Sequence, residues 1–528
     1  MKTNYKYMVV VLLATLFASC NEWLSEPTPN ETTLEEYFTS EVAAVNNINA
    51  DYVPLMWEWN ANTFYNEFLF GDIMSDDALK GGNGIPDCSY FYSLENFKGN
   101  ADNDAVLQYY RTNYIGIARC NLSLEEIPMM DESLFTTEGM QKRLIAEAKF
   151  LRAMYYFRLV RIFQDVPLVT EVIDETAKWK QPVAPVEEVY ALILKDLNDA
   201  EKDLWEKGDA RFSSASDIGR ATKGAAQAML MKVNLYLKNY EEAENWGKLI
   251  VDGKKYSLHA DYGFNFTLEG ENQAESVFEV QYMSDGQSDW GEGIGFTRGS
   301  YAQIMTRSRG KYWNKTGYGF NKPTQNLYDE YEEGDARRDL TIWAPPASYT
   351  PAYEEIYLGN VYCSRKYAII LEETEEKGTY FDIGHETRGP LNRIDIRYAD
   401  VLLMYAEACL GNGNTATAEW ALEEVRARAR AISADPSTNL PKWPNYTIKV
   451  LGVEKTPTLE EAIRHERRVE LAMEGHRWYD LVRWGIAKET MDYYATTETP
   501  EAQREMAPFI EGVHEYFPLP TKEVELMN

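Results

Sequence analysis

The feature that most limits how this chain can fold is a helical pattern that occurs in adjacent pairs. In residues 224–251, apolar stripes with helical spacing flank a turn at Asn239–Tyr240; they comprise Ala226, Leu230, Val233 and Leu237 before it and Ala243, Trp246 and Ile250 after it. Residues 397–429 repeat this arrangement around a turn at Gly411–Asn414. One such pair cannot bury its apolar faces alone, so we expect several pairs to stack.

Helical periodicity extends over much of the remaining chain. It recurs in residues 104–127, 144–163, 186–204 and 459–484. In the second of these segments Leu151 lies among apolar residues on two faces, which predicts a helix packed between neighbours. The sequence therefore predicts a mainly α fold in which tetratricopeptide-like helix pairs form a scaffold, with Leu151 and Leu230 in the core.

The pattern changes in the middle of the chain. Residues 256–387 are rich in Gly, Tyr and Trp and contain the loop sequence WAPPASYTP. We interpret this stretch as an irregular, loop-rich lobe. It would be mounted on a helical scaffold of residues 34–255 and 388–528, so that 34–528 form one domain.

The N-terminus has the pattern of a bacterial lipoprotein signal. Lys2 and Lys6 form a short positively charged start, and the apolar run that follows is, at about ten residues, too short to span a bilayer. Small residues then precede Cys20, whose thiol would receive the lipid. We predict a signal peptide at 1–19, lipidation at Cys20 and a polar tether at 20–33. A plain secretory signal with an incidental cysteine is the alternative.

Charge restricts the partners. The chain has 84 acidic and 53 basic residues and a net charge of −31. Such a surface repels phosphate backbones and anionic headgroups, so we expect no nucleic-acid partner, and membrane attachment needs a lipid anchor. The cysteines beyond Cys20 are scattered without C-x-x-C spacing, which argues against a zinc site and leaves any disulfide pairing open.

No motif indicates catalysis. His465 and His476 share a helical segment but lack the H-E-x-x-H spacing, and the chain contains neither a phosphate-binding glycine loop nor G-x-S-x-G. Opposite charges three to four residues apart across 465–484 predict an ion-pair network. The sequence therefore predicts no catalytic residue, no cofactor and no metal site. A carboxylate pair of the glycoside-hydrolase type stays open, because nothing selects one.

Five motifs together resemble the SusD/RagB family of outer-membrane nutrient-binding lipoproteins of Bacteroidetes. They are YEEGDARRD, SRKY, RYADVLLMYAEA, ERRVELAMEGHRWYDLVRWG and YFPLPTKEVELMN, and with Cys20 they span nearly the whole chain. The resemblance implies a SusD-like helical fold with four tetratricopeptide-like pairs and a ligand-binding lobe. It also implies a SusC-like TonB-dependent transporter as partner and an outer-membrane location. Glu22 and Glu26 resemble the signal that directs such lipoproteins to the cell exterior.

Two aromatic-rich stretches combine the residue types that bind sugars. Pyranose rings stack on Trp and Tyr, and their hydroxyls need Asp, Asn or Arg. The candidate ligand-binding residues are Trp57, Trp59, Asp76, Asp77 and Asn83 in the first stretch and Trp290, Arg309, Tyr312 and Trp313 in the second. A loop tryptophan can also close a small core, and of Trp57 and Trp59 we expect only one to face ligand. Helical spacing places four others in the core: Trp246, Trp420, Trp478 and Trp484.

We therefore expect a non-enzymatic protein that captures oligosaccharides at the cell surface and passes them to a transporter. An oligopeptide-binding member of the same family is the first alternative. A tetratricopeptide scaffold that binds other proteins through its concave face is the second, and a hydrolase with two carboxyls about 5–10 Å apart beside the tryptophans is the third.

Overall fold

The computed structural model describes residues 33–173, 180–212, 217–283, 298–309, 317–367, 389–435 and 439–527. Within these ranges helices dominate, and the strands are short and arranged in two-stranded sheets. The predicted mainly α fold is therefore confirmed. No helix in the described ranges combines the length and the apolarity that crossing a membrane requires. The predicted signal peptide and Cys20 lie outside these ranges.

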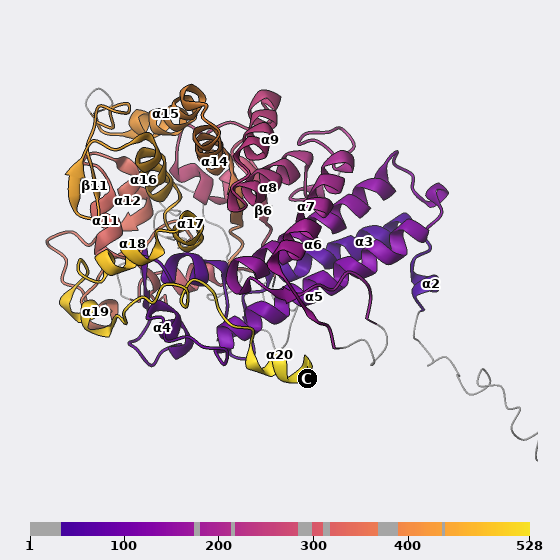
Figure 1. The fold of residues 1–528 in the computed structure, drawn as a ribbon, viewed down its shortest axis with the longest axis horizontal. Helices are drawn as coiled ribbons and strands as arrows, with labels where there is room; N and C mark the ends of the chain where they lie inside the picture. The colour runs from indigo at the N-terminus through magenta and orange to yellow at the C-terminus, as the bar shows by residue number, and fades with distance from the viewer. Residues whose placement is uncertain are drawn as a thin grey trace, which may run out of the picture.

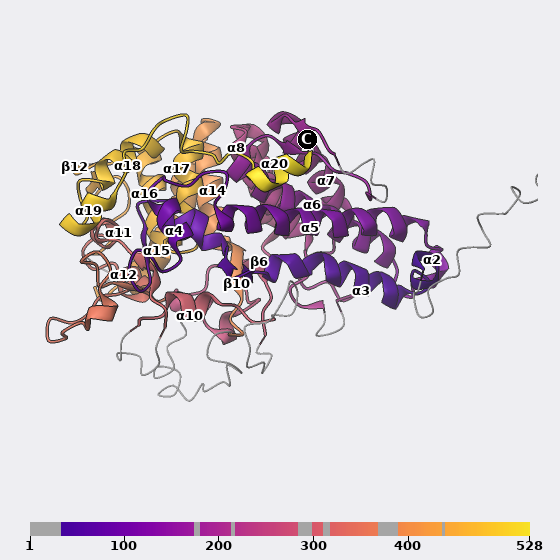
Figure 2. The same ribbon diagram turned by 90° about the horizontal axis from the view of Figure 1, so that it is seen from below.

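The N-terminal half is a stack of long helices (Figures 1 and 2). Their bounds are α3 (Glu41–Tyr52), α5 (Asp104–Glu126), α6 (Met140–Phe163), α7 (Val186–Asp203), α8 (Lys223–Tyr236) and α9 (Tyr240–Gly253). From α5 onward each helix packs on the next one in sequence. Gly116 of α5 is needed for close packing, since a Cβ there would lie 2.4 Å from the ring of Tyr155 in α6. The Tyr155 hydroxyl donates to the Asp51 carbonyl at 2.6 Å, which ties α6 to α3.

A second helical region follows in the C-terminal part. Its members are α14 (Tyr398–Gly411), α15 (Thr415–Ile432), α16 (Leu459–Leu471), α17 (Arg477–Trp484) and α18 (Ala487–Tyr494). Because α14 packs on both α15 and α9, the two predicted helix pairs lie against each other (Figure 1). Leu151 and Leu230 have no exposed surface, which confirms their predicted place in the core.

Short elements connect the middle segment to the scaffold. The other α-helices within the described ranges are α2 (Leu34–Tyr37), α4 (Ser89–Glu95), α10 (Ala302–Thr306), α11 (Gln325–Glu330), α12 (Ala336–Thr341), α19 (Pro500–Glu505) and α20 (Thr521–Met527). The antiparallel strand pairs are β1 (Trp59–Asn60) with β2 (Thr63–Phe64), β3 (Ala78–Gly81) with β7 (Phe320–Pro323), β4 (Val166–Pro167) with β5 (Val183–Ala184), β6 (Ser276–Val280) with β10 (Arg393–Arg397), β8 (Ile342–Trp343) with β9 (Cys363–Ser364), and β11 (Ile448–Val450) with β12 (Val453–Lys455). The β3–β7 and β6–β10 pairs join the middle segment to earlier and later parts of the chain, and α10 lies to one side of the long helices (Figure 2).

The prediction of continuous helix over residues 459–484 is wrong in one respect, because the segment forms two helices rather than one. Between α16 and α17, Met473 and Gly475 adopt φ values of +65° and +80°. The break brings the backbone of Gly475 against Gly71, where a Cβ would lie 2.0 Å from the Gly475 carbonyl oxygen. Periodicity alone could not detect this interruption, since the spacing of charged and apolar residues continues across it.

The predicted ion-pair network in this region is confirmed. Glu470 is fully buried, and its carboxylate pairs with Arg337 at 2.9 Å, with Arg397 at 2.6 Å and with Arg428. Burial acts to raise the pKa of Glu470, but the three guanidinium groups hold it well below its usual range. All three arginines come from other parts of the chain, so the network joins the middle segment and the C-terminal helices to α16.

Candidate functional site

Two strands bring the two predicted ligand stretches together. β3 ends with Gly81 opposite Phe320 of β7, and the Gly82 N–H donates to the Gly319 carbonyl at 2.9 Å. Gly81 has a φ of +79°, and a Cβ there would lie 2.0 Å from the Gly319 oxygen. Only glycine therefore fits at Gly81, where strands β3 and β7 meet. As a result, residues 82–88 lie beside Arg309 and Gly319.

The loop at 82–88 presents a polar edge formed by Asn83, Asp87 and Arg309. Buried Lys80 holds the loop from beneath, because its Nζ donates to the carbonyls of Gly84 at 2.9 Å and Asp87 at 2.7 Å. The Asp87 carboxylate accepts from the Asn83 N–H at 2.7 Å and lies 3.8 Å from Arg309 Nη1. The Asn83 side chain is exposed, and those of Asp87 and Arg309 are partly exposed. This Asn83–Asp87–Arg309 edge offers hydrogen-bonding groups of both kinds to a ligand.

A partly exposed aromatic ring lies at the other end of α10. Trp59 in β1 packs on buried Tyr301, with ring centroids 6.5 Å apart. The Tyr301 N–H donates to the Glu58 carboxylate at 2.6 Å, and the Tyr282 hydroxyl donates to the same group at 3.0 Å. Burial raises the pKa of Glu58, although Arg393 opposes the shift. The Trp59 ring is thereby held by buried neighbours while part of it stays at the surface.

The other tryptophan of the first stretch lies in the core. Trp57 is 5% exposed, and the Arg119 guanidinium lies 5.1 Å from its ring centroid. The structure therefore places only one of the two adjacent tryptophans at the surface.

Asp76 and Asp77 are buried and engaged by arginine side chains. Asp76 pairs with Arg477 at 2.8 Å and with Arg468 at 2.8 Å, and Asp77 pairs with Arg468 at 2.9 Å. Burial acts to raise the pKa of Asp76, but the two guanidinium groups hold it at about 2. Both carboxylates thus anchor the start of β3 to α16 and α17, and neither belongs to the exposed edge at Asn83.

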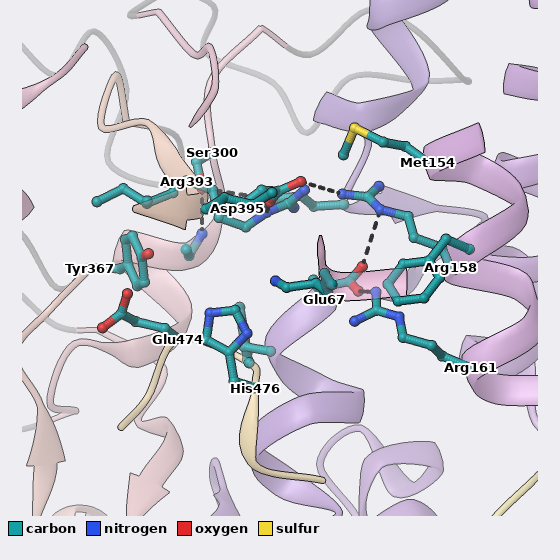
Figure 3. Close-up of a pocket in the computed structure, with 18 of the residues that line it drawn as sticks. Glu67, Met154, Arg158, Arg161, Ser300, Tyr367, Arg393, Asp395, Glu474 and His476 are labelled. Carbon is teal, nitrogen blue, oxygen red and sulfur yellow. Dashed lines mark hydrogen bonds and ion pairs between the residues drawn. The ribbon is translucent and has the colours of Figure 1, made fainter. Parts of the chain in front are cut away.

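An interior polar cavity lies between α6, β10 and the turn before α17 (Figure 3). Figure 3 shows Arg158 between two carboxylates; it lies 3.0 Å from Asp395 and 3.7 Å from Glu67. Arg161 pairs with Glu67 at 2.8 Å, and Arg393 pairs with Asp395 at 3.0 Å. The cavity volume of about 60 Å³ leaves room for a few water molecules and is far below the several hundred Å³ of a typical ligand pocket.

Two carboxyl groups of the cavity, those of Asp395 and Glu67, have pKa values below their usual range. Burial acts to raise the pKa of Asp395, but Arg393 and Arg158 hold it at about 2, and arginines likewise lower the pKa of Glu67. Both groups are therefore ionised at neutral pH and cannot act as general acids. Burial lowers the pKa of His476 to about 4. Across the described ranges, no three His, Cys, Asp or Glu side chains are grouped so as to hold a metal ion.

Several sequence predictions concern residues outside the described ranges. Trp290, Tyr312 and Trp313 belong to this set, as does Cys20. Among the tryptophans expected in the core, Trp478 is 1% exposed, and Trp246 and Trp484 are partly buried. The prediction for Trp420 is wrong, because its side chain is 41% exposed on the outer face of α15.

Three residues near the candidate site were not selected from the sequence. Glu58 lies between the two tryptophans, Asp87 closes the loop with Asn83, and Tyr301 supports Trp59. The G-G-N-G-I-P-D composition indicates a tight loop in which Asp87 can accept backbone hydrogen bonds, so Asp87 had a detectable signal. The Glu58–Tyr301 contact joins residues far apart in sequence, so no local sequence signal indicates it.

Comparison with known proteins covers nearly the whole chain. A sequence model of the SusD family matches residues 274–528, and a model described as starch-binding, associating with the outer membrane, matches residues 13–235. SusD-like protein P2 of Formosa agariphila is 24% identical over 507 residues, which is 92% of this chain and 92% of that protein.

Solved structures share the architecture. A laminarin-binding SusD-like protein superposes with a TM-score of 0.75 and 29% identity, over 92% of this chain and 98% of that one. Surface glycan-binding protein A of Bacteroides thetaiotaomicron, solved in complex with laminarihexaose, gives a TM-score of 0.73 at 23% identity, over 92% and 98% of the two chains. The second match supports the fold, which these comparisons identify as the tetratricopeptide-like helical scaffold.

Proposed function

The chain belongs to the SusD/RagB family, and from this premise we propose that it captures oligosaccharides at the cell surface and delivers them to a TonB-dependent outer-membrane transporter. The family is associated with the outer membrane. The laminarin-binding relative supports a carbohydrate as the class of ligand. In this role the protein binds ligand without chemical conversion.

One observation carries the proposal in this chain: the partly exposed Trp59 ring and the Asn83–Asp87–Arg309 edge lie at the two ends of one short segment. Tyr301, beneath Trp59, precedes α10, and Arg309 follows it. At about 1.5 Å per helical residue, the segment spans roughly 10–15 Å. An aromatic face at one end and hydrogen-bonding groups at the other suit an extended, hydroxyl-rich ligand.

Calorimetric titration of wild type and Trp59→Ala against neutral oligosaccharides tests this assignment. Loss of the stacking face should weaken binding by about 1–3 kcal/mol, which is roughly tenfold or more. Trp420→Ala is the matched control, because it removes a 41% exposed tryptophan from α15. Equal affinities for the two variants would refute a role for Trp59.

The same titrations discriminate among the alternatives. Binding of oligopeptides without binding of any sugar would favour an oligopeptide-binding member of the family. Release of shortened sugars during incubation with wild type would indicate a hydrolase. Co-purification of a β-barrel transporter with the membrane-bound protein would support the proposed partner.

A further inference from the structure

A groove with a volume of about 710 Å³ lies outside the site described so far. It runs between the connection from α7 to α8 and the segment 268–281 that contains β6. A hollow of about 190 Å³ shares Ile218, Gly219 and Gln281 with the groove and extends to Leu55 and Met56. The groove adjoins the Trp59 site through Gln281, because the next residue, Tyr282, donates its hydroxyl hydrogen to the Glu58 carboxylate beside Trp59 at 3.0 Å.

The floor of the groove is a network of side-chain amides. Asn272 and Gln281 exchange two hydrogen bonds, at 2.9 and 3.1 Å, and Asn392 Nδ2 donates to Gln281 Oε1 at 3.0 Å. Gly219, with a φ of +83°, allows the opposite wall to approach, since a Cβ there would lie 2.3 Å from Gln281 Cγ. The amides are therefore fixed before any ligand arrives, which lowers the entropy cost of binding.

The floor also carries a carboxyl group for which the described part of the chain supplies no ion-pair partner. Glu271 is partly buried and accepts from the Asn392 N–H at 2.8 Å, and no ion pair to it is found among the described residues. Burial raises the pKa of Glu271 to about 7. The nearby Lys207 Nζ donates to the carbonyls of Gln273 at 2.6 Å and Ser276 at 2.7 Å. Above about pH 7 this carboxylate accepts hydrogen bonds from hydroxyls and disfavours anionic ligands.

The arginine that lines the groove is also engaged elsewhere. Arg220 lies 3.1 Å from Glu147 and donates to Asn49 at 2.7 Å. The apolar side chains of the wall are Ile218, which is 59% exposed, and the partly exposed Phe212 and Leu268. A polar floor beneath an apolar wall matches a pyranose, which has hydroxyls at its rim and C–H groups on its faces.

We propose that this groove is a remote subsite for a neutral oligosaccharide whose other end lies at Trp59 and the Asn83–Asp87–Arg309 edge. The inference rests on the proposed function and extends it to the length and charge of the ligand. Long neutral chains should bind more tightly than short ones, because only long chains reach the amide floor.

Titration with trisaccharides and hexasaccharides of the β1,3-glucan, β1,4-glucan, α1,4-glucan, xylan and mannan series tests the subsite. In the series that binds, wild type should prefer the hexasaccharide by about tenfold. Ile218→Arg obstructs the groove from an exposed position and should remove most of that preference, while the trisaccharide affinity and the melting temperature stay unchanged. Gln281→Ala should weaken hexasaccharide binding about fivefold and leave the trisaccharide unaffected.

Val513→Arg is the matched control for the blocking variant. Val513 is 58% exposed and does not line the groove, so its replacement should keep the hexasaccharide preference. Equal hexasaccharide affinities for Ile218→Arg and Val513→Arg would overturn the remote subsite and leave the Trp59 site standing. Equal affinities of wild type for the trisaccharide and the hexasaccharide would also overturn the remote subsite and leave the Trp59 site standing. Failure of wild type to bind any of these sugars would overturn the proposed function as well.

Discussion

The backbone N–H of Tyr301 donates to the Glu58 carboxylate at 2.6 Å, which joins the start of α10 to the hairpin that carries Trp59. Through this bond a residue from the middle segment becomes the support for an aromatic ring from the N-terminal part of the chain. The candidate site is therefore assembled by tertiary contacts, while the helices supply a rigid base beneath it.

The packed helices should be sensitive to loss of core volume. Leu151→Ala and Leu230→Ala each remove a fully buried side chain and should lower the free energy of unfolding by about 2–5 kcal/mol. Leu249→Ala is the control, because Leu249 is 52% exposed on α9. Urea denaturation measures all three. A change below about 0.5 kcal/mol at Leu151 or Leu230 would contradict their place in the core.

The network around Glu470 should depend on its charge. Glu470→Ala leaves Arg337, Arg397 and Arg428 without their shared carboxylate in a buried setting. We expect a loss of about 3–5 kcal/mol in the free energy of unfolding. Lys248 and Asp252 form an exposed pair on α9, so Asp252→Ala should cost little. Thermal denaturation compares the loss of a buried carboxylate with the loss of an exposed one. Equal decreases in melting temperature for the two variants would contradict the role assigned to Glu470.

His465 should make stability depend on pH. Burial acts to lower its pKa, but hydrogen bonds to Glu330 at 2.7 Å and Glu332 at 3.3 Å raise it to about 9. Because the folded pKa exceeds the unfolded value of about 6.5, the imidazolium stabilises the fold fully below about pH 6.5. This contribution is lost as the pH rises through about 9.

His465→Gln tests that dependence. The variant should be less stable than wild type by on the order of 2–3 kcal/mol at about pH 6, and the difference should shrink above about pH 9. Urea titrations at both pH values measure it. His514→Gln is a suitable control, since burial lowers the pKa of His514 and its protonation does not stabilise the fold. A difference that is independent of pH would contradict the charged state of His465.

Local periodicity was sufficient to predict the long helices from α5 to α9 and the core positions Leu151 and Leu230. α5, α6 and α7 lie where apolar spacing placed them, because each buries a continuous face. The core prediction for Trp420 was wrong because helical spacing does not reveal whether a neighbouring element covers a large apolar side chain. In α15 no neighbour among the described residues covers Trp420 completely. The contact of Gly475 with Gly71 and the use of Asp76 by Arg468 depend on segments hundreds of residues apart. For the same reason, sequence could suggest Asn83 and Arg309 as site residues but not their joint contact with Asp87.

The predicted lipid anchor gives a test at the N-terminus. Cys20→Ala removes the thiol that would carry the lipid, so the protein should move from the membrane fraction to the soluble fraction while its fold is kept. Cys88→Ala is the control, since Cys88 is a free cysteine in the folded part. Fractionation followed by immunoblotting measures both. Retention of Cys20→Ala in membranes of cells that lack the transporter would contradict lipidation at this residue.

Glu58→Gln should affect ligand binding through Trp59. The carboxylate accepts hydrogen bonds from the Tyr301 N–H, the Tyr282 hydroxyl and the Ser300 hydroxyl, the last at 3.1 Å. A glutamine has one acceptor oxygen and places an NH₂ donor against the remaining partners, at a cost of about 1–3 kcal/mol in stability. Because Tyr301 supports the Trp59 ring, affinity for the oligosaccharide that wild type binds should fall about fivefold.

Glu498→Gln separates a binding effect from a stability effect. Glu498 is also buried, at 4% exposure, and accepts a backbone N–H from Asn326 at 2.9 Å, but it lies away from Trp59 near the start of α11. The Glu498→Gln variant should lose a similar amount of stability and keep its full affinity for the oligosaccharide. Calorimetric titration and thermal denaturation of both variants give the comparison. If the two variants lose the same stability and neither loses affinity, then Glu58 supports the fold alone and the Trp59 ring does not depend on it for binding.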